Sequence, residues 1–163
     1  MLIRMDGSSD NRLAQRVRRL FGDASCRLQV AALPWRVVDG RLEVMLITSR
    51  DTGRWILPKG WADKREAPAD AAAREAREEA GIKGSVSRRE AGRYFYAKAQ
   101  RAGPPVPCEV VVYPLEVQKL AASWKEKAER RRQWFVPETA AGLVREPDPA
   151  ELIRRFGRVS HAA

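Results

Sequence analysis

Hydrophobic residues along this chain recur with two periods, one typical of helices and one typical of strands. Near the N-terminus, Leu13, Val17 and Leu20 recur at helical spacing with arginines between them. This spacing predicts an amphipathic helix over 11–21, and Gly22 ends it. We therefore expect a basic helical extension to precede the rest of the fold.

Runs of apolar and β-branched residues predict a set of short strands. Asp39-Gly40 lies between the first two runs, and this pair favours the tight turn of a hairpin. Three prolines and a glycine predict a loop over 100–107. The predicted strands are 27–35, 42–48, 54–57, 86–90, 93–98, 109–117 and 134–136.

Between residues 68 and 80 the composition changes to alanine, glutamate and arginine, which all favour helix. Pro68 suits the first turn of a helix and Gly81 suits its end, so a central helix is predicted over 68–80. Two closing helices are predicted over 137–144 and 148–156.

The last closing helix is expected to have Asp148 as its N-cap and Pro149 at its first position. Strands surrounding a central helix, followed by a helical C-terminus, are typical of an α+β fold or a mixed sandwich. The chain has no linker that would divide it, so we expect one domain over 1–163. Within it, the extension is 1–22 and the core is about 26–157.

The composition is that of one folded domain: 163 residues, with 44% hydrophobic and 32% charged. No apolar run approaches the roughly 18 residues that a membrane span needs, and no secretory signal is expected. Cys26 and Cys108 lie far apart without a CxxC motif, and His161 is the single histidine. Neither a disulfide framework nor a zinc site is expected, and a reducing cytoplasm fits best.

The chain is strongly basic, with 31 lysines and arginines against 21 acidic residues and a net charge of +10. Positive charge is concentrated in 1–22 and 123–135, with the remainder spread along the chain, so it does not form a basic tail. Such an excess favours phosphate-rich ligands or nucleic acid as partners. The alternative is a surface that only increases solubility.

Three carboxylates share one face of the predicted central helix. Glu75, Glu78 and Glu79 stand at positions i, i+3 and i+4, so they repel one another unless a cation lies among them. Oxygen donors without sulfur or imidazole point to a hard ion, Mg²⁺ or Mn²⁺, and therefore to phosphate chemistry. The alternative is an exposed acidic face that pairs with Arg74 and Arg77.

This segment resembles the Nudix box, Gly-x5-Glu-x7-Arg-Glu-U-x-Glu-Glu-x-Gly-U, where U is a bulky aliphatic residue. Ile82 matches the second U, and Ala76 is smaller than the usual residue at the first. The fixed positions are matched by Gly60, Glu66, Arg74, Glu75, Glu78, Glu79 and Gly81. The resemblance implies a Nudix fold, an α/β/α sandwich around a mixed sheet. It also implies hydrolysis of a phosphoanhydride by water with Mg²⁺ or Mn²⁺ as cofactor.

The resemblance also implies roles for the box residues. Glu75, Glu78 and Glu79 match the metal-binding carboxylates, and Glu75 or Glu78 would also orient or deprotonate the attacking water. Arg74 is expected to hold the glutamates in position. Glu66 is expected to be an auxiliary ligand of the metal or its water, or a cap of the helix.

A wider resemblance, over about 27–144, is to the diphosphoinositol polyphosphate phosphohydrolase branch. That branch acts on inositol pyrophosphates and on dinucleoside polyphosphates. The segments that carry it are 48–50, 54–60, 74–84 and 124–135. The phosphate-binding residues it implies are Arg27, Ser49, Arg50, Arg54, Lys59 and Arg130. The backbone carbonyl of Lys59 or Gly60 would be a further metal ligand.

Two residues depart from that branch. Gln29 and Glu109 occupy positions where the inositol-phosphate enzymes have basic residues, which favours a dinucleoside polyphosphate or a related nucleotide. Trp61 follows the first glycine of the box and is a candidate for base stacking, with a core or lid position as the alternative. Glu126 and Glu129 are candidates for a late carboxylate of the site, with a solvated loop as the alternative.

Two other functions remain as alternatives. A Nudix-fold module could bind RNA or a nucleotide without hydrolysis, but such modules typically lose box glutamates and none is missing here. An enzyme acting on RNA 5′ ends would also be basic, yet the sequence has no separate RNA-binding element beyond the N-terminal arginines. The expected partner is therefore an anionic polyphosphate small molecule, with RNA less favoured and no membrane.

Overall fold

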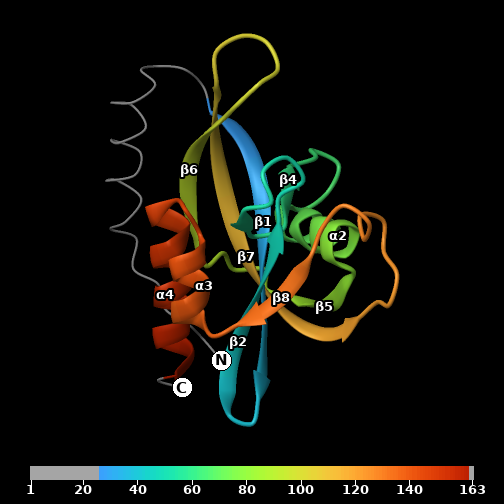
Figure 1. The fold of residues 1–163 in the computed structure, drawn as a ribbon, viewed down its shortest axis with the longest axis vertical. Helices are drawn as coiled ribbons and strands as arrows, with labels where there is room; N and C mark the ends of the chain where they lie inside the picture. Colours follow the sequence, from blue (N-terminus) through green and yellow to red (C-terminus); the bar gives the residue numbers. More distant parts are fainter. Residues whose placement is uncertain (1–25, 162–163) are drawn as a thin grey trace.

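The computed structural model describes residues 26–161, in which one mixed sheet lies between helices (Figure 1). The helix predicted over 11–21 lies outside the described residues. The strands are β1 (Arg27–Val38), β2 (Arg41–Thr48), β3 (Trp55–Ile56), β4 (Lys59–Trp61), β5 (Ile82–Val86), β6 (Gly92–Lys98), β7 (Val106–Leu120) and β8 (Arg132–Phe135). The helices are α2 (Pro68–Ala80), α3 (Pro137–Leu143) and α4 (Pro147–His161).

The eight strands form one sheet whose main path runs β3-β2-β1-β7-β5. Strand β4 pairs with β1, β6 with β7, and β8 with β2. The long central pair, β1 and β7, is parallel, and the other pairs are antiparallel. The sheet is therefore mixed, as predicted.

Alternate residues of β1 point into two separate cores. Val30 and Ala32 belong to a cluster with the buried alanines of α2, whereas Ala31 and Leu33 belong to a cluster with α3 and α4. Because successive side chains of a strand point to opposite faces, α2 covers one face of the sheet and α3 with α4 covers the other. Figure 1 shows the same three layers. The α+β prediction, with an α/β/α sandwich, is confirmed.

Helix α2 has the predicted bounds. Pro68 occupies its first turn, and Gly81 follows it in the left-handed region at φ 65°, donating its N–H to the carbonyls of Ala76 and Arg77. Glycine adopts this conformation without the steric cost that a Cβ imposes. Ala76 is fully buried, so a small residue at this position lets the helix approach the sheet closely.

The strand predicted over 86–90 is wrong, because β5 begins directly after the cap of α2 and ends at Val86. A register shift between Lys83 and Gly84 lets β5 pair with β7. The chain then turns: Ser87 donates its N–H to the carbonyl of Pro114, and its hydroxyl accepts the N–H of Arg89. The pairing of β5 with β7 is a contact between distant segments, which residue spacing does not reveal.

Other bounds also differ from the sequence predictions, and β7 begins at Val106, inside the loop predicted over 100–107, because pairing with β6 extends it. Helix α4 begins at Pro147, so Asp148 lies in its first turn and the prediction that Asp148 is the N-cap is wrong. Strand β4 was not predicted, since three residues are too few to show a period. No helix in residues 26–161 is long and apolar enough to cross a membrane.

Candidate active site

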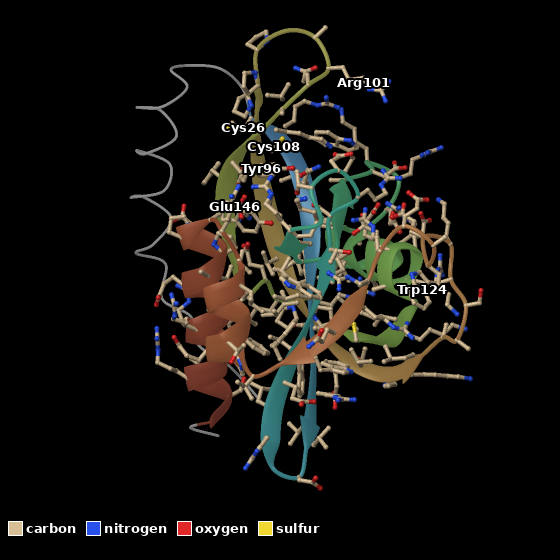
Figure 2. The ribbon with its side chains drawn as sticks, viewed as in Figure 1. Cys26, Tyr96, Arg101, Cys108, Trp124 and Glu146 are labelled. Atoms are coloured by element: carbon tan, nitrogen blue, oxygen red, sulfur yellow. The ribbon has the colours of Figure 1, made fainter. Side chains whose placement is uncertain are left out.

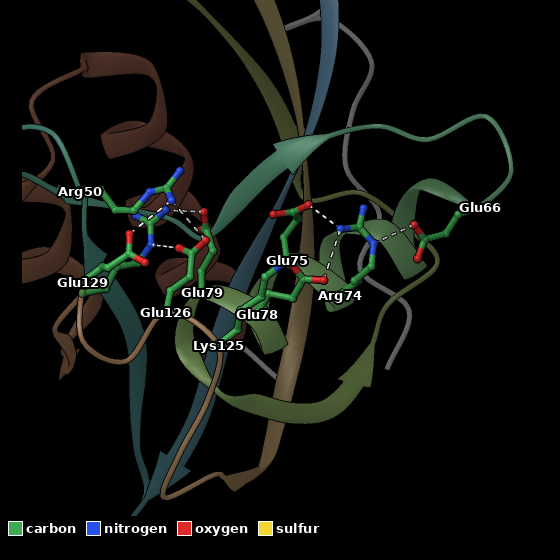
Figure 3. A network of polar contacts seen from close by, with 10 residues as sticks. Arg50, Glu66, Arg74, Glu75, Glu78, Glu79, Lys125, Glu126 and Glu129 are labelled. Atoms are coloured by element: carbon green, nitrogen blue, oxygen red, sulfur yellow. Dashed lines mark hydrogen bonds and ion pairs between the residues drawn. The ribbon is translucent and has the colours of Figure 1, made fainter.

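The three glutamates of the central helix lie on the side of α2 that faces β4 and the loop between β7 and β8 (Figure 3). Glu79 is buried, with 7% of its surface exposed. The side chains of Glu75 and Glu78 are 15% and 27% exposed. The structure thus places the predicted carboxylates on one side of α2, with Glu75 and Glu78 partly accessible to solvent.

Glu79 is held from two sides. Its Oε2 accepts the backbone N–H of Lys59 at 3.0 Å, and its Oε1 accepts Nη2 of Arg130 at 2.6 Å. Its backbone carbonyl accepts the indole N–H of Trp124 at 3.1 Å. Burial raises the pKa of Glu79 to about 7, and the charge of Arg130 and the Lys59 N–H oppose this shift. The carboxylate therefore depends on a neighbouring cation to remain charged.

Arg130 lies beneath the carboxylates, with only 6% of its side chain exposed. Besides Glu79, it donates Nε to Glu126 at 2.5 Å and Nη1 to the carbonyl of Thr48 at 3.0 Å. These contacts link β2, α2 and the loop before β8. The structure thus places this predicted phosphate-binding residue in a buried network, with its donors directed at protein oxygens.

Arg50 lies at the outer edge of the same network (Figure 3). Its Nη1 is 3.3 Å from Glu129 and 3.7 Å from Glu126, and over half of its side chain is exposed. The loop glutamates proposed from the sequence therefore lie beside the box glutamates, and Glu126 is close enough to raise the pKa of Glu79. Glu126 is largely buried, which argues against a purely solvated loop.

Arg74 lies among the other acidic residues of the site. It donates to Glu66 at 3.1 Å and to Glu75 at 2.7 Å, and lies 4.0 Å from Glu78. These contacts are those of a residue that orients carboxylates.

Lys125 binds Glu78 at 2.7 Å, and this hydrogen bond is the main cause that lowers the pKa of Glu78. The sequence analysis did not single out Lys125, although it belongs to the basic segment 123–135.

Gly60 leaves room for the side chain of Glu75 beside β4 because it has no Cβ. A Cβ at Gly60 would collide with the carboxylate of Glu75, so any larger residue would push that side chain away. Its neighbours on β4, Lys59 and Trp61, point to the opposite face of the sheet. Strand β4 therefore separates the glutamates from a second group of side chains.

The donor chemistry of the site fits a hard divalent ion, since Glu75, Glu78 and Glu79 supply carboxylate oxygens without sulfur or imidazole. The gap left by Gly60 gives Glu75 the room it needs. Within residues 26–161, however, no three acidic, histidine or cysteine side chains already stand in a metal-holding arrangement. The carboxylates are turned toward arginines and lysine, so an ion would replace these partners.

Ser49 and Arg54 stand in the turn between β2 and β3. The hydroxyl of Ser49 accepts the backbone N–H groups of Thr52 and Arg54, so it shapes the turn. The side chain of Arg54 is 43% exposed, and its Nη1 lies 3.9 Å from Oε1 of Glu146. Of these two predicted phosphate ligands, Arg54 therefore has the more accessible donors.

Arg27 and Lys59 lie on the face of the sheet opposite to α2, and their contacts are with aromatic rings. Arg27 stacks on Trp61, and the amine of Lys59 lies over the ring of Tyr96. Trp61, the candidate for base stacking, is therefore already covered in part by a cation.

Gln29 and Glu109, the two predicted departures from the inositol-phosphate enzymes, each have a polar partner in the fold. Gln29 is buried and accepts the hydroxyl of Tyr96 at 2.5 Å. Glu109 forms an ion pair with Arg93 at 2.8 Å. Neither position supplies a positive charge to the site.

A helical carboxylate cluster packed against a mixed sheet, with basic side chains around it, suits a divalent ion and the chemistry of phosphate compounds. The sequence profile of the NUDIX domain matches residues 27–156. The chain therefore belongs to the NUDIX family.

Relatives of known name support this assignment. Nudix hydrolase 16, mitochondrial, of Arabidopsis thaliana is 31% identical over 144 residues, covering 81% of this chain and 79% of that protein. Diphosphoinositol polyphosphate phosphohydrolase 3-alpha of Homo sapiens is 35% identical over 119 residues, covering 70% and 68%. The C. elegans Ap4A hydrolase structure shares the fold, with a TM-score of 0.61 at 23% identity over 82% of this chain and 98% of that one.

The chain is accordingly an enzyme, a Nudix hydrolase that acts on phosphoanhydride bonds. Nudix hydrolases generally use divalent metal ions, in agreement with the oxygen donors found here. By its name, the human relative acts on a polyphosphate small molecule.

Proposed function

We propose that this enzyme is a Mg²⁺-dependent pyrophosphohydrolase that uses water to cleave a phosphoanhydride of a highly phosphorylated small molecule. The preferred substrate is a dinucleoside polyphosphate, with a diphosphoinositol polyphosphate as the second member of the same class. The names of the relatives support this class, since they include a diphosphoinositol polyphosphate phosphohydrolase and an Ap4A hydrolase.

The observation that carries the proposal is the arrangement of Glu75, Glu78 and Glu79 on α2, with Arg74, Lys125 and Arg130 against them. Mg²⁺ or Mn²⁺ bound by these oxygens would neutralise phosphate charge and lower the pKa of the attacking water. Glu79 is the carboxylate best fixed for binding the ion. Glu75 or Glu78 would orient the water or accept its proton.

Other residues of the chain support these carboxylates. Glu66 acts through Arg74, whose guanidinium joins it to Glu75. Arg50 and Arg54 have exposed donors for phosphate oxygens, and such charge-assisted contacts are strong. The backbone carbonyl of Lys59, on the strand beside Glu79, completes the proposed ligand set.

The choice of a dinucleoside polyphosphate rests on Gln29 and Glu109. An inositol pyrophosphate is ringed by phosphates and needs cations on several sides. Gln29 is neutral and bound to Tyr96, and Glu109 is negatively charged. A linear chain of phosphates needs fewer cations in this region.

A substrate panel with Mg²⁺ tests the proposal. It contains diadenosine polyphosphates, an inositol pyrophosphate, ADP-ribose, nucleoside triphosphates and 5′-triphosphorylated RNA, with products separated by ion-exchange chromatography. We expect turnover of a polyphosphate class, falling by orders of magnitude in Glu79→Gln because a metal ligand is lost while the side-chain shape is kept. Equal turnover in this variant, or cleavage of RNA alone, would contradict the proposal.

We also propose that the enzyme works in the cytoplasm. Cys26 and Cys108 are free thiols, which suits a reducing compartment. Fractionation of cells that express the tagged protein tests this, and recovery in an organelle would contradict it.

A further inference from the structure

The C-terminal turn of α2 is held by the loop that joins β7 to β8, residues 121–131, together with the first residue of β8. A helix leaves its last four carbonyls without partners inside the helix. In α2, the N–H of Gly81 donates to the first of these four. The other three belong to Glu78, Glu79 and Ala80, so two of them belong to proposed metal-binding residues.

Each of these three carbonyls, taken in chain order, accepts a hydrogen bond from the loop or from β8. The backbone N–H of Glu126 donates to the first at 3.2 Å. The indole N–H of Trp124, which lies beside α2 in Figure 2, donates to the second at 3.1 Å. Nη1 of Arg132 donates to the third at 2.6 Å. One backbone group and two side chains thus complete the hydrogen bonding of the helix end.

Trp124 and Arg132 also contact each other. The guanidinium carbon of Arg132 lies 4.0 Å from the ring centroid of Trp124, a distance at which the aromatic face attracts positive charge. Nη2 of Arg132 donates to the carbonyl of Ala121 at 2.9 Å, and the N–H of Ala121 donates to the carbonyl of Gly81 at 2.8 Å. The stacked pair is therefore bound both to the loop and to the cap of α2.

Gly81 gives this pair the room that it occupies. A Cβ at Gly81 would lie 2.9 Å from Nη1 of Arg132 and 3.1 Å from side-chain carbons of Trp124. The left-handed backbone at this position already favours glycine. The last fixed glycine of the Nudix box therefore has a second effect in this chain, which is to let Trp124 and Arg132 approach the helix end.

The same loop also holds the side chains of the two glutamates. Lys125 binds the carboxylate of Glu78 at 2.7 Å, and Arg130 binds that of Glu79 at 2.6 Å. An ion bound by these carboxylates would replace such side-chain partners. The hydrogen bonds to the main-chain carbonyls use no carboxylate oxygen, so they can remain when the ion binds. The direction in which both glutamates leave the helix then depends on these main-chain contacts.

We propose that Trp124 and Arg132 are positioning residues of the metal site, which fix the last turn of α2 so that Glu78 and Glu79 present their carboxylates to the ion. This inference rests on the proposed function and deepens it, because it assigns the positioning of the ligands to the β7–β8 loop. The charge of Arg132 also offsets the negative end of the helix dipole beside the carboxylates. Partners that orient metal ligands typically contribute ten- to a hundredfold in metal affinity or activity.

Mn²⁺ binding to the substrate-free enzyme, followed by electron paramagnetic resonance, tests the role of Trp124. Trp124→Phe keeps an aromatic ring for Arg132 and removes the N–H donor. We expect the Kd for Mn²⁺ to rise about tenfold and kcat to fall about tenfold, with KM for the polyphosphate changed less than about twofold. The control, Trp134→Phe, makes the same change on β8, where the ring stacks on Arg36, and should alter each quantity less than about twofold.

Variants of Arg132 separate positioning from a general loss of structure. Arg132→Leu removes the charge and both donors, so it should weaken Mn²⁺ binding about tenfold. Arg132→Lys keeps the charge and a donor and should recover part of this loss. Urea denaturation of every variant measures stability separately. A loss of stability with unchanged Mn²⁺ affinity and unchanged kcat would overturn the inference, as would an equal effect of the control.

The Glu79→Gln variant distinguishes failure of this inference from failure of the proposed function. Equal Mn²⁺ affinity in the wild-type protein and in Glu79→Gln would refute the metal site of the proposed function, and the inference with it. An affinity that depends on Glu79 but not on Trp124 or Arg132 would refute the inference alone.

Discussion

At the scale of single residues, the geometry of the site depends on which atoms each charged group contacts. Glu79 and Arg130 are both buried and bind each other at 2.6 Å, so each charge is compensated by the other. Glu75 reaches its position because Gly60 has no side chain. One hydrogen atom in place of a methyl group therefore decides where a carboxylate of the site lies.

Replacing Gly60 with alanine tests this close approach. The added methyl group would displace Glu75, and we expect kcat to fall by roughly a hundredfold, since small misplacements at a reacting centre are costly. Steady-state kinetics on the best polyphosphate of the panel measure the effect. Gly142→Ala is the matched control, because nothing lies within 4 Å of its Cβ position. Normal turnover by Gly60→Ala would show that Glu75 is dispensable in this position.

At the scale of elements, the site forms where α2, β4 and the loop before β8 meet. Helix α2 lies close to the sheet because Ala71, Ala72, Ala76 and Ala80 are fully buried along one face. Arg130 then joins the loop to α2 through Glu79 and to β2 through the carbonyl of Thr48. The loop is thereby fixed to the core.

Replacing Arg130 with methionine tests this connection. Loss of one partner leaves Glu79 and Glu126 without their buried cation, and we expect a loss of about 3–5 kcal/mol in the free energy of unfolding. Urea denaturation followed by circular dichroism measures it. Arg131→Met, at a more exposed neighbouring position, should cost less than about 1 kcal/mol. Equal costs for the two variants would argue against a buried network.

At the scale of the whole molecule, the chain carries a net charge of +10, and its basic side chains have different partners in different places. Around the glutamates, basic side chains neutralise acidic ones. Across β4, the side chains of Arg27, Lys59 and Lys98 lie against aromatic rings. Positive charge therefore meets carboxylates on one side of β4 and aromatic rings on the other.

Thermal unfolding with and without Mg²⁺ tests the metal site proposed at the glutamates. A ligand that binds only the folded state at a hundred times its Kd stabilises by about 2.7 kcal/mol, which for a chain of this size raises Tm by about 5 °C or more. Glu79→Gln should lose most of this rise, and NaCl at equal ionic strength should not reproduce it. A similar rise in the variant would place the ion elsewhere.

Most of the local structure of the site could be predicted from the sequence. Pro68, Gly81 and the alanine-rich composition between them predicted the bounds of α2, because helix propensity and capping act over a few residues. The spacing of Glu75, Glu78 and Glu79 predicted their common face for the same reason. The Nudix resemblance, and with it the fold and the class of reaction, also followed from residues 60–82.

What only the tertiary structure decided involves residues distant in sequence. The pairing of Glu79 with Arg130 spans 51 positions, and β5 obtained its bounds from β7. Strand β4 is too short to show a period, yet it places Gly60 against Glu75 and turns Lys59 and Trp61 to the other face. Helix propensity and capping depend on short stretches of sequence, whereas these contacts form only when the sheet brings remote segments together.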